Sequence, residues 1–329
     1  MIKLFQTLAV AAVLAPAFGA PAAEFPAKDK PISIVVPFAA GGPTDSVARD
    51  LAEAMRKPLG GARIVVDNAA GAGGTIGANK VAKAIADGHT LLLYHIGMAT
   101  SPALYRNLPY RTLEDFEYLG LVNEVPMTLI GRPSIPANNF AELRTWLNAN
   151  KGKLNLANAG LGAASHLCGL LFMQAIGMDM ITVPYKGTGP AITDLIGGQV
   201  DLLCDQTTNT ATHILSRKVK AYGVTTATRL TTPGLKDLPT LQEAGLKGFE
   251  VTIWHGLYAP KGTPPDVLKK INSALKAALK DPEFIRKEEG LGAVIVADQR
   301  VEPAEHKKFV AAEIAKWGAV IRSAGVYAE

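Results

Sequence analysis

The chain is organised around Ile34-Val-Val-Pro-Phe-Ala-Ala-Gly-Gly-Pro-Thr-Asp45, which joins a β-branched run to a loop of small residues and the start of a helix. The run Ile32–Val36 predicts a strand. Gly41 and Gly42 lack a Cβ atom, so backbone N–H groups in the loop can approach a ligand closely. Such a turn can bind an anion, because backbone amides and the positive end of a helix dipole meet there. The same pattern also suits an ordinary tight turn, and this segment alone leaves both interpretations open.

Strand-like and helix-like patterns alternate outward from this segment. Thr44 or Asp45 is expected to cap a helix over Ser46 to about Lys57. The predicted strands are almost continuously apolar, which suits a parallel sheet covered on both faces, and their alternation with helices predicts βαβ units. The series runs twice, so we expect an α/β protein of two domains. Further strands are predicted at Arg63–Val66, Thr90–Tyr94, Tyr118–Val122, Thr128–Ile130, Leu154–Ala157, Ile181–Tyr185, Val200–Cys204, Val219–Thr225 and Val251–Tyr258.

The composition suits a soluble globular protein. The chain has 329 residues, of which 48% are hydrophobic and 19% charged, enough for one large or two medium domains. The formal net charge is +5, but the basic residues are scattered and no Lys/Arg run is interleaved with aromatics. Nucleic-acid binding therefore has little support, whereas a mild positive field helps to attract small anions.

Residues 1–22 have the pattern of a cleavable signal peptide. Lys3 precedes the apolar run Leu4 to Ala15, and Ala20-Pro-Ala22 provides the small residues of a cleavage site. The apolar run is too short for a confident membrane span, and no later stretch is apolar enough to cross a bilayer. We therefore expect the mature protein to be exported.

The two cysteines and six histidines give no metal signal. Cys168 and Cys204 are the only cysteines, and after export they can form a disulfide or remain two buried thiols. The histidines show no H-x-x-x-H or H-E-x-x-H spacing, so no metal site is predicted.

Four loops that follow predicted strands share one character: they are rich in Gly, Ala, Ser and Thr, and nearly all lead into a helix. Two lie in each half of the chain. Ligands of open α/β sheets sit beyond the carboxyl ends of strands, often between domains. The loops therefore predict a cleft that closes on a small anion, with chance recurrence of glycine turns as the alternative. They are Phe38–Asp45, Ala69–Thr75, Ala159–Ser165 and Lys186–Pro190.

Signals for an enzyme are weak. A dinucleotide fingerprint at Gly71-Ala-Gly-Gly-Thr-Ile-Gly77 fails because residue 76 is Ile, and neither a P-loop nor a G-x-S-x-G elbow occurs. Ser165 and His166 are neighbours on a helix, where adjacent side chains point in different directions. No catalytic residue and no cofactor are predicted. Asp205, at the carboxyl end of a strand, is a candidate cleft residue, whereas Asp201 is expected to start that strand in solvent.

Several motifs, in the order in which they occur, resemble those of the Bug-type (TctC-like) solute receptors of tripartite tricarboxylate transporters. The resemblance covers nearly the whole mature chain, and is greatest to members that bind amino acids such as aspartate. The motifs are Pro37-Phe-Ala-Ala-Gly-Gly-Pro-Thr-Asp45, Val66-Asp-Asn-Ala-Ala-Gly-Ala-Gly-Gly-Thr-Ile-Gly77, Asn158–Leu167, Val183-Pro-Tyr-Lys-Gly-Thr-Gly-Pro-Ala191, Gly198-Gln-Val-Asp201, Trp254-x-Gly256 and Ala259-Pro-Lys-Gly-Thr-Pro264.

The resemblance implies a two-domain periplasmic binding protein of the type II Venus-flytrap class, without catalysis. It implies a first domain of residues 23–124 and 225–329, a second of 125–224, and hinges near Gly120–Val125 and Tyr222–Thr226. A ligand carboxylate would be held by backbone amides and waters. Ala163-Ala164 departs from the family's G-[ST] pair. The implied ligand-binding residues are Phe38, Ala39, Gly42, Thr44, Asp45, Gly73, Gly74, Thr75, Ala159, Gly160, Ala163, Ser165, His166, Lys186, Gly187, Thr188 and Asp205.

The expected function is that of a monomeric periplasmic receptor. It would bind a small carboxylate, an amino acid such as aspartate or a di- or tricarboxylate, and deliver it to the large and small permease subunits in the membrane. Asp205 would favour a ligand with an amine. Two alternatives are an exported, hydrolase-like α/β enzyme and a flytrap sensor for a signalling partner.

Overall fold

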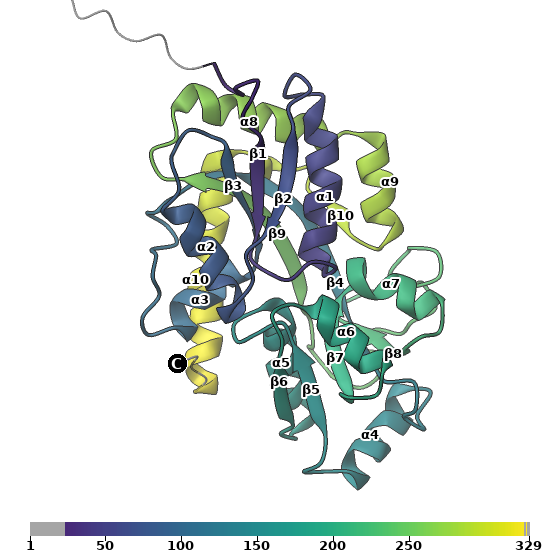
Figure 1. Ribbon diagram of the computed structural model, residues 1–329. Helices are drawn as coiled ribbons and strands as arrows, with labels where there is room; N and C mark the ends of the chain where they lie inside the picture. Colours follow the sequence, from purple (N-terminus) through teal and green to yellow (C-terminus); the bar gives the residue numbers. More distant parts are fainter. Residues whose placement is uncertain (1–23, 326, 328–329) are drawn as a thin grey trace, which may run out of the picture.

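The computed structural model describes residues 24–325 and residue 327 (Figure 1). The predicted signal peptide, residues 1–22, lies outside them. The strands are β1 (Ile32–Val36), β2 (Ile64–Asn68), β3 (Thr90–His95), β4 (Phe116–Gly131), β5 (Asn155–Asn158), β6 (Ile181–Pro184), β7 (Leu202–Gln206), β8 (Lys220–Val224), β9 (Thr252–Pro260) and β10 (Val294–Ile295). The helices are α1 (Pro43–Arg56), α2 (Thr75–Ala82), α3 (Gly97–Leu104), α4 (Phe140–Ala149), α5 (Ala164–Ile176), α6 (Thr188–Ile196), α7 (Thr207–Leu215), α8 (Pro265–Ala278), α9 (Pro282–Gly290) and α10 (Pro303–Ala324), with short 3-10 turns η1 (Ala72–Gly74) and η2 (Gln299–Val301).

Strand β4 joins two halves of one mixed sheet, whose order is β2-β1-β3-β9-β4-β7-β5-β6, with β8 and β10 also on β4. Up to Pro126 it pairs antiparallel with β9, and from Met127 it pairs with β7. Strands β1, β2 and β3 are mutually parallel in the first half, as are β5, β6 and β7 in the second. The prediction of two short strands here is wrong: polar residues interrupt the apolar pattern, but Asn123 among them is buried and the strand continues.

The chain returns from the second half beside the place where it enters. Thr225 N donates to Met127 O at 3.0 Å, and Val251 N donates to Thr225 O at 3.1 Å. Thr225 therefore bonds to both crossing segments next to the change of partner on β4. The predicted domain boundaries and hinges stay predictions. Met127 and Thr225 lie at or within two residues of them, whereas Val251 lies far beyond the boundary at 224/225, because Pro239 and Leu241 are bonded to Val224 in the second half.

Three helices have weak signals in the sequence, each for a local reason. Helix α3 is buried on most sides and contains Pro102, so it lacks a polar face and a helical period. Helix α7 is rich in Thr, which has low helix propensity. Helix α9 starts at Pro282, directly after α8, where a proline would also be typical of a helix end; Asp281 caps α9 by accepting from the backbone N–H groups of Glu283 and Phe284.

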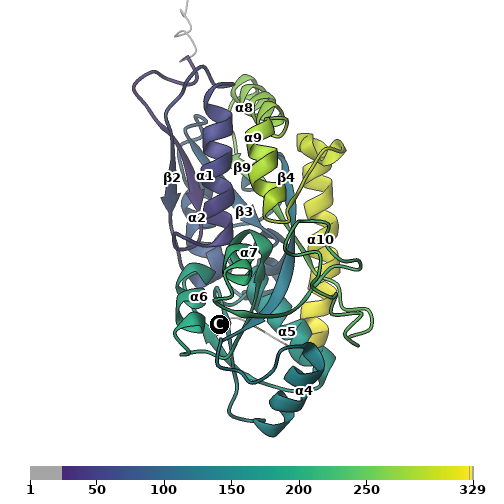
Figure 2. The same cartoon turned by 90° about the vertical axis from the view of Figure 1, so that its right-hand side faces the viewer.

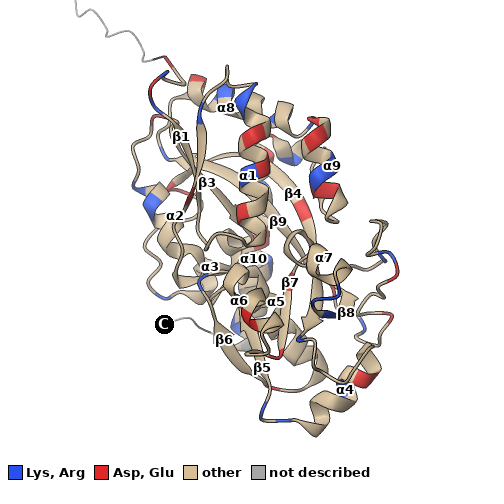
Figure 3. Cartoon of the chain, turned by 45° about the vertical axis from the view of Figure 1, so that its right-hand side comes forward, with Lys and Arg blue, Asp and Glu red and all other residues tan. Residues whose placement is uncertain are grey.

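The helices cover the sheet and carry mixed charge. Helix α1 packs against α8 and α9 (Figure 2), and the contacts of α10 are mainly with α3 and β4. Acidic and basic residues lie side by side on α1 and α9 rather than in a stripe of one sign (Figure 3). Of the helices described, none has both the length and the apolar character needed to span a bilayer.

Candidate functional site

The loops of the two halves meet around a small cavity, which in this closed form has room for about one water molecule. Two sets of residues line it. The first wall, from the first half, consists of Phe38, Gly42, Pro43, Thr44 and His95. The second wall consists of Ala159, Ala164, Ser165, Thr188, Asp205 and Gln206. The structure thus brings together seven residues of the predicted site: Phe38, Gly42, Thr44, Ala159, Ser165, Thr188 and Asp205.

The two halves touch each other around this cavity. Ala39 N donates to Lys186 O, and Tyr105 Oη donates to Leu161 O, each at 2.8 Å. Thr100 Oγ1 makes a further bond of 2.8 Å, to the carbonyl of Gly162. A Cβ added at Gly189 would lie 2.7 Å from the carbonyl oxygen of Ala40, closer than real contacts allow. The structure therefore shows the cleft closed, with backbone packed against backbone at its rim.

The first loop is held by a side chain that points away from the cavity. Helix α1 starts at Pro43 with Gly42 as its N-cap, so the prediction that Thr44 or Asp45 caps this helix is wrong. The Asp45 carboxylate accepts from Gly41 N, from Arg49 and from Asn68, each at 3.0 Å. Burial alone would raise the pKa of Asp45, but these bonds outweigh it and lower that pKa. Asp45 and the Gly41 amide are thus engaged within the loop rather than in the cavity.

His95 is a cavity residue that the sequence analysis missed. Its ring stacks on Phe38, with centroids 4.7 Å apart. Gly97 N donates to His95 Nδ1 at 3.0 Å, so the ring proton of the neutral imidazole sits on Nε2. Burial, and then His255, lower the pKa of His95 well below its usual value. The available signal was a polar residue directly after the predicted strand Thr90–Tyr94, at its carboxyl end.

Asp205 places a buried carboxyl group in the second wall. It is 1% exposed, near the carboxyl end of β7, and Asn209 Nδ2 donates to it at 2.6 Å. Burial raises the pKa of Asp205 to about 6, against the opposing effect of hydrogen bonds from Asn209, Thr188 and Gln206 N. Asp201 is not solvated as expected: it pairs with Arg132 at 2.8 Å and is largely buried.

The other predicted residues lie behind the cavity or at its rim. His166 Nδ1 accepts from Gly162 N at 3.3 Å, and burial lowers the pKa of His166 to about 4. Thr75 Oγ1 donates to Ala72 O within its own loop. Outside the cavity lining are Ala39, Asp45, Gly73, Gly74, Thr75, Gly160, Ala163, His166, Lys186 and Gly187, of which Gly73, Gly160 and Lys186 line a neighbouring groove.

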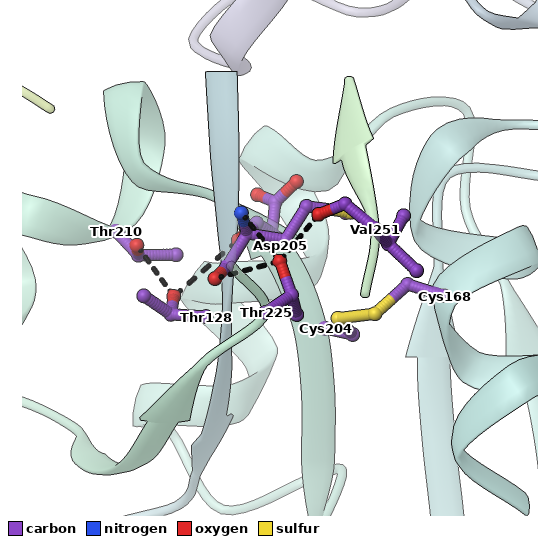
Figure 4. The surroundings of a disulfide bond; sticks show 8 residues. Thr128, Cys168, Cys204, Asp205, Thr210, Thr225 and Val251 are labelled. Atoms are coloured by element: carbon purple, nitrogen blue, oxygen red, sulfur yellow. Dashed lines mark hydrogen bonds between the residues drawn. A yellow bond between two sulfur atoms is a disulfide. The ribbon is translucent and has the colours of Figure 1, made fainter. Parts of the chain in front are cut away.

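A disulfide crosses the second wall. It joins Cys168 on α5 to Cys204 on β7, with Cα atoms 6.0 Å apart (Figure 4). The sequence left this bridge open against two free thiols. Ser165 lies in the first turn of α5 and Asp205 directly follows Cys204, so the bridge ties together two elements that carry cavity residues. Within residues 24–325, no three His, Cys, Asp or Glu side chains cluster as metal ligands would.

Comparisons with known proteins agree with this geometry. Residues 47–326 match the family described as "Tripartite tricarboxylate transporter family receptor". The chain belongs to this family. It is 50% identical to the periplasmic binding protein BugD over 92% of this chain and 99% of that one, with a TM-score of 0.88. MatC from Rhodopseudomonas palustris, solved with bound malate, is 39% identical over 89% of this chain and 99% of that one, with a TM-score of 0.84. Another R. palustris protein, solved with adipate, is 32% identical over 92% of this chain and 99% of that one, with a TM-score of 0.85.

Membership settles three predictions. The resemblance stated from the motifs is confirmed, and so is the α/β fold of a type II periplasmic binding protein. Members of this family are solute-binding receptors and not enzymes. The third prediction, that the protein has no catalytic activity, is therefore confirmed, and the hydrolase-like alternative is removed.

Proposed function

We propose that this receptor closes on a small carboxylate, an amino acid such as aspartate or a di- or tricarboxylate, and delivers it to its transporter. The observation that carries the proposal is the meeting of small-residue loops from both halves around one cavity in the closed cleft. Relatives solved with malate and with adipate support a small carboxylate as the ligand.

Backbone amides, ordered waters and the two walls would hold the ligand. The loops supply amides near a helix N-terminus at Pro43, which favours a carboxylate. Asp205 would meet a ligand amine. The predicted residues behind the cavity then act by shaping the loops or by closing the rim, as the bond from Ala39 N to Lys186 O already does.

Several finer features belong to the same proposal. Residues 1–22 are a signal peptide that sends the chain to the periplasm, where it works as a monomer. Its partners are the large and small membrane subunits of the transporter. The halves are two domains divided near residues 124/125 and 224/225, and ligand binding shifts the balance between open and closed forms by rotation at the hinges.

A thermal-shift screen of amino acids, C4–C6 dicarboxylates and aromatic acids tests the proposal. A true ligand at 100 times its Kd stabilises the folded form by about 2.7 kcal/mol, and its melting temperature rises accordingly. Gly42→Val is the matched control. A single Cβ at Gly42 would make only ordinary contacts, at 3.5 Å or more, so it is the larger valine that fills the cavity and abolishes the shift. If no carboxylate raised the melting temperature and native mass spectrometry found none co-purified, the proposal would fail.

A further inference from the structure

We infer that a buried chain of hydrogen bonds, running from Glu288 to Thr44, makes the cavity selective for carboxylates that carry a hydroxyl or amino substituent. The chain fixes Thr44 as a hydrogen-bond acceptor toward the ligand, beside a donor on His95. This inference rests on the proposed function, because it assumes that the ligand occupies the cavity. It assigns a part in specificity to Glu288, Asn123 and His255, none of which lines the cavity.

The chain links four elements of the first half. Asn123 Nδ2, on β4, donates to Glu288 Oε2, on α9, at 2.8 Å. Asn123 Oδ1 lies 2.8 Å from Nδ1 of His255 on β9. His255 Nε2 lies 3.2 Å from Thr44 Oγ1 at the start of α1, in the cavity lining. None of the four side chains is more than 2% exposed, so water does not compete for these bonds.

The carboxylate at one end, when it is ionised, sets the direction of every bond. Ionised Glu288 can only accept, so Asn123 turns its amide nitrogen to Glu288 and its oxygen to His255. Burial lowers the pKa of His255 to about 3, and its neutral ring therefore has one proton, on Nδ1. Nε2 must then accept the hydroxyl proton of Thr44. The Thr44 oxygen is left with lone pairs only, and a ligand group that meets it has to donate.

His95 has the opposite tautomer. Gly97 N occupies its Nδ1, so its proton is on Nε2, and that atom has no hydrogen-bond partner among the residues the structure describes. The centroids of the two imidazoles are 6.1 Å apart. The first wall thus offers a donor on His95 for a carboxylate oxygen and an acceptor on Thr44 for a hydroxyl or ammonium group. An unsubstituted dicarboxylate would leave Thr44 unpaired or facing an oxygen, and a site built to hydrogen-bond a substituent discriminates strongly against ligands that lack it.

The first experiment compares L-malate with succinate, which differ by one hydroxyl, by calorimetry on the full mature chain. Burial, and then Asp50, raise the pKa of Glu288 to about 7, so the titrations are run at pH 8.5, where Glu288 is ionised. We expect malate to bind at least tenfold more tightly than succinate. Glu288→Gln should reduce that ratio at least fivefold, because glutamine can accept or donate and no longer fixes the direction. Thr44→Val should bring the ratio close to one. Glu289→Gln, an exposed neighbour, is the matched control and should leave the ratio unchanged.

The second experiment reads the tautomers directly. ¹⁵N NMR of the wild-type protein should show the proton of His255 on Nδ1 and that of His95 on Nε2, a result that does not depend on how any variant folds. A proton on Nε2 of His255, or an unchanged ratio in a folded Glu288→Gln protein, would overturn the inference. If malate and succinate bind equally well, this inference fails and the proposed function stands. If no carboxylate binds at all, the proposed function fails.

Discussion

The two walls of the cavity are held in place by different means. The first wall is supported by neutral buried histidines, and its hydrogen-bonding character depends on where single protons lie. The second wall is supported by a covalent bridge, Cys168–Cys204, between two of the elements that form it. The two walls therefore differ in role. The first wall selects ligands by their hydrogen-bonding groups, whereas the second keeps Asp205 and Ser165 at a fixed spacing.

Removing the bridge should have the largest effect. In Cys168→Ala/Cys204→Ala we expect the free energy of unfolding to fall by roughly 4 kcal/mol, the loop-closure value for a separation of 36 residues. Urea unfolding with and without reductant measures it: reductant should weaken the wild type and leave the double variant unchanged. If the His255 tautomer also changed in this variant, the two walls would not be independent.

Blocking the contact between the two walls should have the second-largest effect. Gly189→Ala places a Cβ 2.7 Å from the carbonyl oxygen of Ala40, and neither backbone can move without opening the cleft. We expect ligand affinity by calorimetry to fall about 100-fold, with the melting temperature of the ligand-free protein nearly unchanged. Gly197→Ala, at the other end of α6, makes no contact shorter than 3.4 Å and is the control. Normal affinity in Gly189→Ala would mean that binding does not need the closed form.

The pH dependence of binding should separate the contribution of Asp205. Because burial raises the pKa of Asp205 to about 6, the group is protonated below that pH and ionised above it. An ammonium ligand favours the ionised form, so affinity for aspartate should rise as pH increases from 5 to 7. A dicarboxylate without an amine should bind more weakly over the same range. Each change should approach tenfold per pH unit at its steepest.

The Asp205→Asn variant isolates this effect, since it keeps the titration of the ligand itself and removes that of the protein. Calorimetry at several pH values gives both profiles. For each ligand, the change of affinity with pH in the variant is subtracted from that in the wild type. If the remaining changes had the same direction for both ligands, Asp205 would not meet the ligand amine.

The smallest effect concerns a single bond across the rim. Tyr105→Phe removes the bond from Tyr105 Oη to Leu161 O, which joins the two halves in the closed form. A neutral hydrogen bond contributes about 1 kcal/mol net, so we expect about a fivefold loss of affinity. Tyr110→Phe is the control, because its buried hydroxyl has no partner among the described residues. Equal losses in both variants would point to general loosening rather than to the rim.

The fold was predictable where local chemistry agrees with tertiary structure. Small-residue loops after apolar strands identified the family and the class of fold. The errors arise where long-range contacts override the local pattern: Asn123 is hidden inside β4 by bonding to Glu288, which is 165 residues away. Helix α3 has no polar face because it is packed on most sides.

The site was predictable at the level of loops and less so at the level of side chains. Phe38, Thr44 and Asp205 line the cavity as the motifs implied. Asp45 does not, because the motif shows that an aspartate is present and not that Arg49 and Asn68 hold it. For His95 the only signal was weak: it is a polar residue directly after a predicted strand. The hydrogen-bond chain from Glu288 to Thr44 had no signal in the sequence, because its members are brought together only by the packing of α1, β4, β9 and α9.

Strand β4 has one further consequence, which concerns the gene. Pro126 and Thr252 are direct partners on paired strands, so the whole segment between them enters and leaves the first half at adjacent points. The second half is therefore an insertion with its two ends side by side, an arrangement in which a segment can be exchanged as a unit. A chimaera that carries residues 127–251 of a relative would inherit one wall from each parent. Mutation and recombination can thus adjust the two walls of this receptor separately.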